Sequence, residues 1–132
     1  MENRPPLTTG DSVPHVAVTL VNGTPWDYAA AWQRRNLLLV TLPAAQDAAT
    51  NQYIADLDAA TDEWRAMETI CVVTHDLIPG LVAPGVLVAD RWGEVQFVVH
   101  KSSVAELPDV ATLLVWVRSV EHQCPECQGE AL

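Results

Sequence analysis

Two of the three cysteines stand close together near the end of the chain. Cys124 and Cys127 form a C-x-x-C pair with the sequence Cys-Pro-Glu-Cys. At that spacing two sulfur atoms can close a disulfide or bind one metal ion, provided that the two Cα atoms come within about 7 Å. His122 lies two residues earlier and adds a third ligand of the kind that zinc and other soft metals prefer. The pair therefore suits either thiol–disulfide exchange or metal binding.

The neighbouring residues leave both alternatives open. Pro125 suits the first turn of a helix with Cys124 at its positive end, which would lower the pKa of that thiol. Glu126 and Glu130 act in the opposite direction, because nearby carboxylates raise a thiol pKa. A metal site would need a fourth ligand, which a second copy of the chain in a two-fold dimer would supply. A tail that does neither is the third alternative.

Composition narrows the class of protein. The chain has 132 residues, of which 49% are hydrophobic and 18% charged, as expected for one globular domain. The formal net charge of -10 repels phosphate backbones and anionic membrane surfaces, so we expect no nucleic acid and no membrane partner. No secretory leader or membrane-spanning run is evident, so we expect a cytoplasmic protein. Thiols are normally kept reduced in the cytoplasm.

The apolar pattern predicts a domain of the α/β class. Residues 37–42 and 68–74 are continuous apolar runs, typical of strands covered on both faces. Residues 44–67 carry apolar residues three or four apart, typical of a long amphipathic helix. A strand–helix–strand unit of this kind has parallel strands.

Shorter signals complete the predicted organisation. They predict strands at 13–20, 84–90 and 94–100, a turn at 90–93, and helices at 25–35 and from 107 or 108 to 122. Residues 76–81 are too short for a full helix. We expect an N-terminal arm (1–12), one domain (13–122) and a C-terminal tail (123–132) that carries the C-x-x-C pair.

The order of these elements resembles the thioredoxin fold, in particular its redoxin and peroxiredoxin branch, which includes the alkyl hydroperoxide reductases and thiol-specific antioxidants. Residues 10–16 (Gly-Asp-Ser-Val-Pro-His-Val) and 20–23 (Leu-Val-Asn-Gly) are similar to the start of that family's domain. Residues 84–95 (Pro-Gly-Val-Leu-Val-Ala-Asp-Arg-Trp-Gly-Glu-Val) are similar to its cis-proline strand and following hairpin. The resemblance covers about residues 10 to 122. It implies a thioredoxin-like three-layer sandwich, with a mixed central sheet flanked by helices.

The resemblance also implies a position for a reactive cysteine that this chain does not fill. In thioredoxin-like redox enzymes that cysteine follows the central strand at the start of the long helix, where free N–H groups and the positive helix end stabilise a thiolate. The corresponding residues 41–50 contain no cysteine. Asp47 lies among them, but a carboxylate cannot replace a thiol as a reversible nucleophile toward peroxide. Ordinary peroxidase activity is therefore not expected.

Three other residues bear on the site. The resemblance implies that the Ala83–Pro84 peptide bond is cis. The backbone of Ala83 would then be free to pair with an extended substrate. The alternative is that Pro84 simply begins a strand. His75 follows a strand at the edge where open α/β sheets bind ligands, although a solvated loop histidine is the plainer interpretation. Cys71, inside an apolar strand, is expected to pack as a small hydrophobic residue.

The leading hypothesis is a redoxin-like protein that acts in thiol–disulfide exchange or redox sensing through Cys124 and Cys127, with no cofactor. The alternative is a non-catalytic binding or assembly module, a homodimer in which His122, Cys124 and Cys127 hold zinc or another soft metal. In either case the partner is a protein or a thiol substrate.

Overall fold

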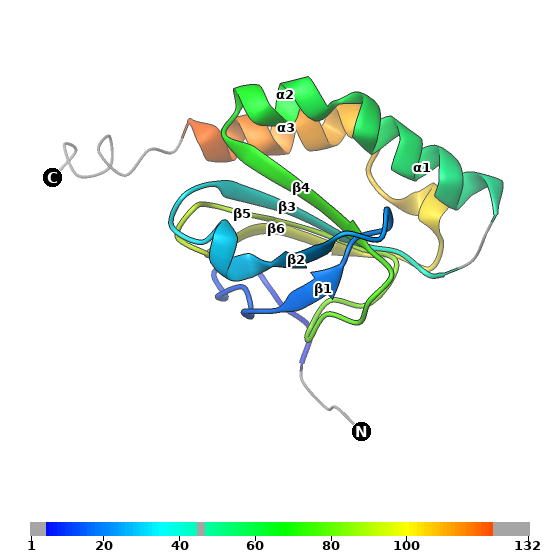
Figure 1. Cartoon of the computed structure of the whole chain (residues 1–132), viewed down its shortest axis with the longest axis horizontal. Coiled ribbons are helices and arrows are strands. Elements are labelled where there is room, and N and C mark those ends of the chain that lie inside the picture. Colours follow the sequence, from blue (N-terminus) through cyan, green and yellow to red (C-terminus); the bar gives the residue numbers. More distant parts are fainter. Residues whose placement is uncertain (1–4, 45–46, 123–132) are drawn as a thin grey trace, which may run out of the picture.

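The centre of the molecule is a four-stranded sheet with the strand order β4-β3-β5-β6. It is seen in a computed structural model that describes residues 5–44 and 47–122 (Figure 1). The strands are β3 (Asn36–Thr41), β4 (Thr69–Thr74), β5 (Gly85–Ala89) and β6 (Val95–His100). β3 is parallel to β4 and antiparallel to β5, which is antiparallel to β6. The predicted mixed sheet is confirmed.

Three helices cover one face of this sheet: α1 (Ala48–Ala59), α2 (Thr61–Ala66) and α3 (Val110–Glu121) (Figure 1). Their buried side chains pack against alternate residues of the central strands, with Leu57, Trp64 and Leu113 meeting Leu38 and Val40. All six residues of β3 are buried. This is why its central residues 37–40 are continuously apolar instead of alternating with polar residues.

The long helix predicted over 44–67 is two helices. α1 begins only after Asp47, whose side chain accepts a hydrogen bond from the Thr50 N–H. The chain then leaves helical geometry at Ala60, between α1 and α2. Trp64 Nε1 donates to the Leu57 carbonyl at 3.0 Å, and Thr61 Oγ1 donates to a neighbouring carbonyl in the same turn. These side chains add hydrogen bonds to the carbonyls at the break, where the Leu57 carbonyl also accepts from the Ala60 N–H at 3.2 Å.

The other face is covered by a β-hairpin, β1 (Ala17–Thr19) and β2 (Pro25–Asp27), and by the 3₁₀ turn η1 (Tyr28–Ala30). The predicted strand at 13–20 is therefore shorter, and the predicted helix at 25–35 is wrong. Gly23, at φ 92°, lies in the turn that reverses the chain, and Trp26 then pairs with Val18 across the hairpin. The N-terminal arm also lies on this face, where Leu7 is buried.

The remaining connections are short. Residues 75–84 join β4 to β5 without a helix, as predicted. A second 3₁₀ turn, η2 (Val104–Glu106), precedes α3. Within the described ranges no helix is both long and apolar enough to span a bilayer.

Candidate functional site

The carboxyl ends of β3 and β4 form the edge of the sheet at which the sequence places His75 and Pro84. Thr41, the last residue of β3, is paired with Thr74 on one side and with Gly85 on the other. His75 and Pro84 therefore lie at the same edge, two strands apart, which corresponds to about 10 Å. We call this edge the rim.

His75 is held by the backbone at the rim. Its Nδ1 lies 3.1 Å from the Leu42 carbonyl oxygen, and the residue is partly buried. Because a carbonyl only accepts, Nδ1 carries a proton, and Nε2 of the neutral ring is left with a lone pair. His75 is thus a positioned side chain, and not a freely rotating loop residue.

The Asp76 carboxylate is occupied by a structural bond. It accepts a hydrogen bond from the Thr19 N–H at 2.7 Å, while Thr74 Oγ1 donates to the Thr19 carbonyl, also at 2.7 Å. The Asp76 carbonyl in turn accepts from Thr41 Oγ1 at 2.9 Å. These bonds join the hairpin to the end of the sheet, so Asp76 serves to hold the rim together.

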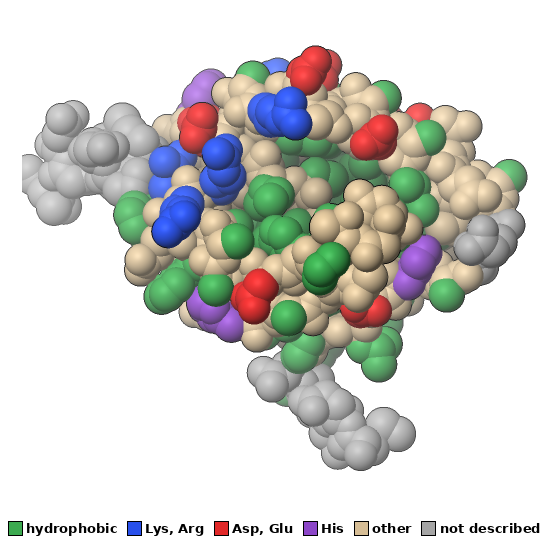
Figure 2. All heavy atoms as spheres, viewed as in Figure 1, with side chains coloured by type: hydrophobic (Ala, Val, Ile, Leu, Met, Phe, Trp, Pro, Cys, Tyr) green, Lys and Arg blue, Asp and Glu red, His purple; other side chains and the backbone are tan. Residues whose placement is uncertain are grey.

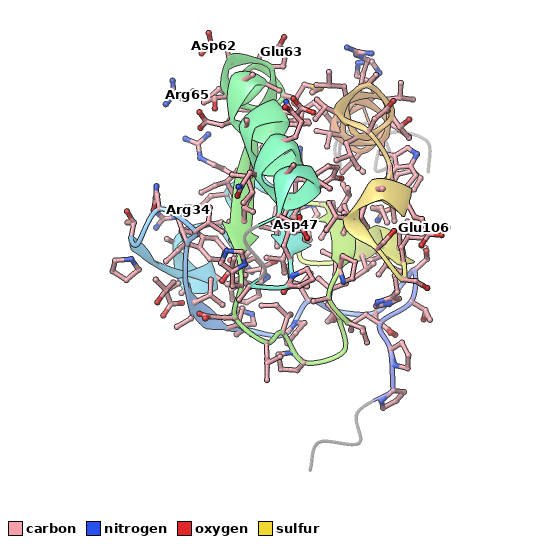
Figure 3. All side chains as sticks on the ribbon, turned by 90° about the vertical axis from the view of Figure 1, so that its right-hand side faces the viewer. Arg34, Asp47, Asp62, Glu63, Arg65 and Glu106 are labelled. Atoms are coloured by element: carbon pink, nitrogen blue, oxygen red, sulfur yellow. The ribbon has the colours of Figure 1, made fainter. Side chains whose placement is uncertain are left out.

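The start of α1 contains a hydroxyl where a redox enzyme of this kind would need a thiol. Thr50 is 1% exposed, and its Oγ1 makes no hydrogen bond of acceptable geometry among the described residues. Its N–H donates to Asp47 at 2.8 Å, and this bond, helped by the nearby Thr50 hydroxyl, lowers the pKa of the Asp47 carboxyl. Figure 3 labels Asp47 at the start of α1. An alcohol without a hydrogen-bonded base is not an activated nucleophile. Thr50 was not predicted as a site residue, although the Asp-x-x-Thr capping pattern indicates its position at the start of the helix.

The Ala83–Pro84 peptide bond is cis, as the resemblance implied. Pro84 is buried, and its carbonyl accepts from the Lys101 N–H at 3.1 Å. Neither the N–H nor the carbonyl of Ala83 has a hydrogen-bond partner in the described part of the chain. The backbone of Ala83 is therefore free to pair with another group.

The tail starts at the opposite end of the sheet from the rim. The Asn36 side chain, at the start of β3, donates to Glu121 Oε1 at 2.7 Å, and Arg91 donates to the same oxygen at 3.1 Å. His122 follows directly at the C-cap of α3 and is exposed. Six residues of β3 separate this point from the rim, a length of about 20 Å. His122 is therefore not brought together with His75 or Pro84.

Cys124 and Cys127 themselves lie outside the described residues. Among residues 5–44 and 47–122, no three His, Cys, Asp or Glu side chains are grouped as a metal site would require.

Cys71 packs against the helix-side core cluster, as predicted for a small hydrophobic residue. The residue as a whole is partly exposed at the edge of the sheet. Even so, desolvation raises the pKa of its thiol to about 12, with a further contribution from the charge of Asp58. Because the thiolate is the nucleophile, this burial disfavours reaction of Cys71 near neutral pH.

No family model matches the sequence, and no curated protein matches it. Solved structures do match the fold. The reduced 2-Cys peroxiredoxin of Plasmodium vivax superposes with a TM-score of 0.72 at 13% identity, covering 89% of this chain and 83% of that one. The yeast mitochondrial 1-Cys peroxiredoxin gives 0.72 at 9% identity, with 88% and 77% covered. Mycobacterium bovis AhpC gives 0.69 at 13% identity, with 89% and 99% covered.

The chain has the thioredoxin-like fold of the peroxiredoxins. At these identities the likeness establishes the architecture and leaves the activity to the residues. Within the peroxiredoxin-like fold of this chain, the rim carries His75, Thr50 and a cis-proline but no cysteine. The candidate reactive thiols are those of the tail.

Proposed function

We propose that the chain acts in thiol–disulfide exchange through Cys124 and Cys127, as a redoxin-like protein whose reactive pair has moved from the start of α1 to the C-terminal tail. The observation that carries this proposal concerns the remaining cysteine. Cys71 has a thiol pKa raised to about 12, and residues 41–50 contain no cysteine. Only the tail pair is then left to react as thiolates.

The exchange proceeds in two steps. The Cys124 thiolate attacks one sulfur of a partner disulfide, which forms a mixed disulfide and releases the other partner sulfur as a thiolate. The Cys127 thiolate then attacks Cys124 in the mixed disulfide, which releases the second partner sulfur and leaves a Cys124–Cys127 disulfide. Two electrons pass from the tail to the partner. A dithiol or a small thiol such as glutathione, as is present in a reducing cytoplasm, returns the tail to the dithiol form.

Trapping of the intermediate tests the proposal. The C127S variant, exposed to a protein disulfide such as that of oxidised thioredoxin, should accumulate a mixed disulfide at Cys124 that a reductant releases. C71S should form no such adduct and should exchange at the rate of the unaltered chain, whereas C124S should not react. A C127S chain that forms no adduct contradicts the proposal.

We propose a second function as the alternative to thiol exchange, since it needs no thiol at the rim. In this alternative the chain is a non-catalytic binding or assembly module and a homodimer, with His122, Cys124 and Cys127 from each copy holding zinc or another soft metal. Native mass spectrometry distinguishes the two. The alternative requires a metal-bearing dimer that loses its metal in C124S, and thiol exchange requires a metal-free chain.

A further inference from the structure

The outer edge of β4 has unpaired backbone groups. β4 is the last strand of the sheet on its side. The carbonyl of Glu68 accepts from the Asn36 N–H in β3, and that of Thr74 accepts from the Leu42 N–H just after β3. Because successive residues of a strand direct their backbone groups to opposite sides, Thr69, Cys71 and Val73 direct theirs outward.

The hairpin covers only one end of this edge. The Val21 N–H donates to the Val73 carbonyl at 2.9 Å, which confirms the outward direction. Across the described ranges, no group bonds the N–H of Val73 or the backbone groups of Thr69 and Cys71. An edge strand with free N–H and C=O groups is a template for an added strand.

A groove runs beside this edge, between β4 and the helices α1 and α2. It consists of two adjoining hollows of about 410 and 320 Å³, which share Thr61 and Cys71 in their linings. Ile54 and Trp64 line it from the helices, and Val73 lines it from β4. Figure 2 shows hydrophobic side chains gathered in a hollow over β4. The groove can therefore accept apolar side chains of a strand that pairs with the edge.

Cations stand at one end of the groove. Arg35 and Arg65 line the hollow near the start of β4, and Arg34 precedes Arg35. Figure 2 shows Lys and Arg side chains in blue on this face, and Figure 3 labels Arg34 and Arg65. These are three of only seven Lys and Arg residues in a chain with a net charge of -10. Asp58, beside Cys71, is the one acidic side chain among those that line the two hollows. The charged side chains that line this end of the groove are thus arginines, while their acidic partners Asp62 and Glu68 lie outside the lining.

The arginines are available to a partner. The Arg35–Glu68 and Arg65–Asp62 pairs each measure 4.0 Å, and all four side chains are about half exposed or more. Such long, exposed ion pairs contribute little to the stability of the fold. The arginines can therefore leave them to pair with carboxylates of a partner.

We propose that the open edge of β4 binds an extended, acidic peptide segment of a partner protein as an added strand. The segment carries apolar residues at alternate positions, which enter the groove, and acidic residues at the end that meets Arg35 and Arg65. An antiparallel strand places its C-terminal end beside the start of β4, so the acidic residues follow the apolar ones in the partner sequence. The proposal is independent of the thiol chemistry of the tail.

The test is an amide-exchange and titration experiment by NMR on the full chain with the peptide acetyl-Thr-Val-Thr-Val-Thr-Glu-Glu-amide. The peptide should shift the amide resonances of Thr69, Cys71 and Val73 in a saturable way and slow their hydrogen exchange at least tenfold. A peptide with two lysines in place of the glutamates should bind at least tenfold more weakly.

Two matched pairs of variants locate the site. Ala55 is exposed and lines the groove, whereas Ala59 is exposed on the same helix outside it. A55W should abolish binding and A59W should retain it. R35E should weaken binding at least tenfold, while K101E, at an exposed residue away from the groove, should not.

Three results would overturn the proposal. The first is the absence of saturable shifts at β4. The second is binding that A55W and A59W affect equally. The third is slow hydrogen exchange of the Cys71 amide in the chain alone, because the edge would then already be occupied. Protection that rises with protein concentration would identify a second copy as the occupant, and protection that does not would identify the chain's own tail.

Discussion

The chemistry of Cys71 gives the sharpest quantitative prediction. In a chain carrying both C124S and C127S, Cys71 is the sole thiol. With its pKa raised from 9.0 to about 12, Cys71 is about one part in ten thousand thiolate at pH 8. An ordinary thiol is about one-tenth thiolate at that pH, so Cys71 should react with iodoacetamide about a thousandfold more slowly than glutathione.

The assay is the pseudo-first-order rate of alkylation, followed by intact mass from pH 7 to pH 10. The rate for glutathione should level off above about pH 9, whereas that of Cys71 should still rise about tenfold per pH unit at pH 10, because its thiolate fraction keeps growing below its pKa. In urea the two rates should become equal. Alkylation of folded Cys71 within tenfold of glutathione at pH 8 would refute the reasoning, and with it the exclusion of Cys71 from the redox site.

Three further predictions concern stability and are checked by urea unfolding followed by tryptophan fluorescence. N36A should lower the free energy of unfolding by about 1–3 kcal/mol, because the buried amide at the start of β3 bonds Glu121; no loss would show that this bond is dispensable. G85A should lower the free energy of unfolding by about 1–3 kcal/mol or more, because a Cβ there would clash with the Val82 carbonyl oxygen, and an unchanged midpoint would disprove that crowding. D47A should lower the urea midpoint of unfolding at pH 7. The difference from the unaltered chain should shrink as the pH falls below 3.8, because a carboxyl whose pKa is lowered by folding stabilises the fold only while it is ionised. A difference that persists in acid would mean that the charge is not responsible.

The central part of the fold could be predicted because its signals are local and redundant. β3 and β4 are apolar on both faces, and the residues between them repeat at helical spacing. These two features alone imply parallel strands joined by a helix on one face. The turn before β6 was equally clear in the sequence, because Gly93 lies between two apolar runs. In the structure Gly93 adopts a φ of 88°, as such a turn requires.

The errors come from interactions that a periodic pattern does not reveal. Residues 25–35 have alanines and tryptophans at helical spacing, but Trp26 pairs with Val18 across a hairpin. The Asn22-Gly23 turn indicated a reversal of the chain, and the prediction followed it with a helix instead of a second strand. The break at Ala60 involves neither glycine nor proline. It depends on side-chain hydrogen bonds, one of them from Trp64, that become evident only once the helices are packed.

The residue missing from the site was easier to predict than the groups that the site contains. The lack of cysteine in residues 41–50 followed directly from the sequence, as did the cis bond before Pro84 from the resemblance. The buried, unbonded hydroxyl of Thr50 and the open edge of β4 were not predicted, because both depend on which neighbours are absent in three dimensions. The roles of Cys124 and Cys127 remain predictions.

One measurement tests the central claim that the tail pair is the redox site. The reduced full chain is exposed to mild peroxide, and native mass spectrometry is combined with peptide mapping of the product. The account predicts a metal-free chain that loses two hydrogens and maps to a Cys124–Cys127 disulfide, with Cys71 still reduced. A disulfide or oxygen adduct at Cys71, or a tail pair that stays reduced while another residue is oxidised, would contradict it.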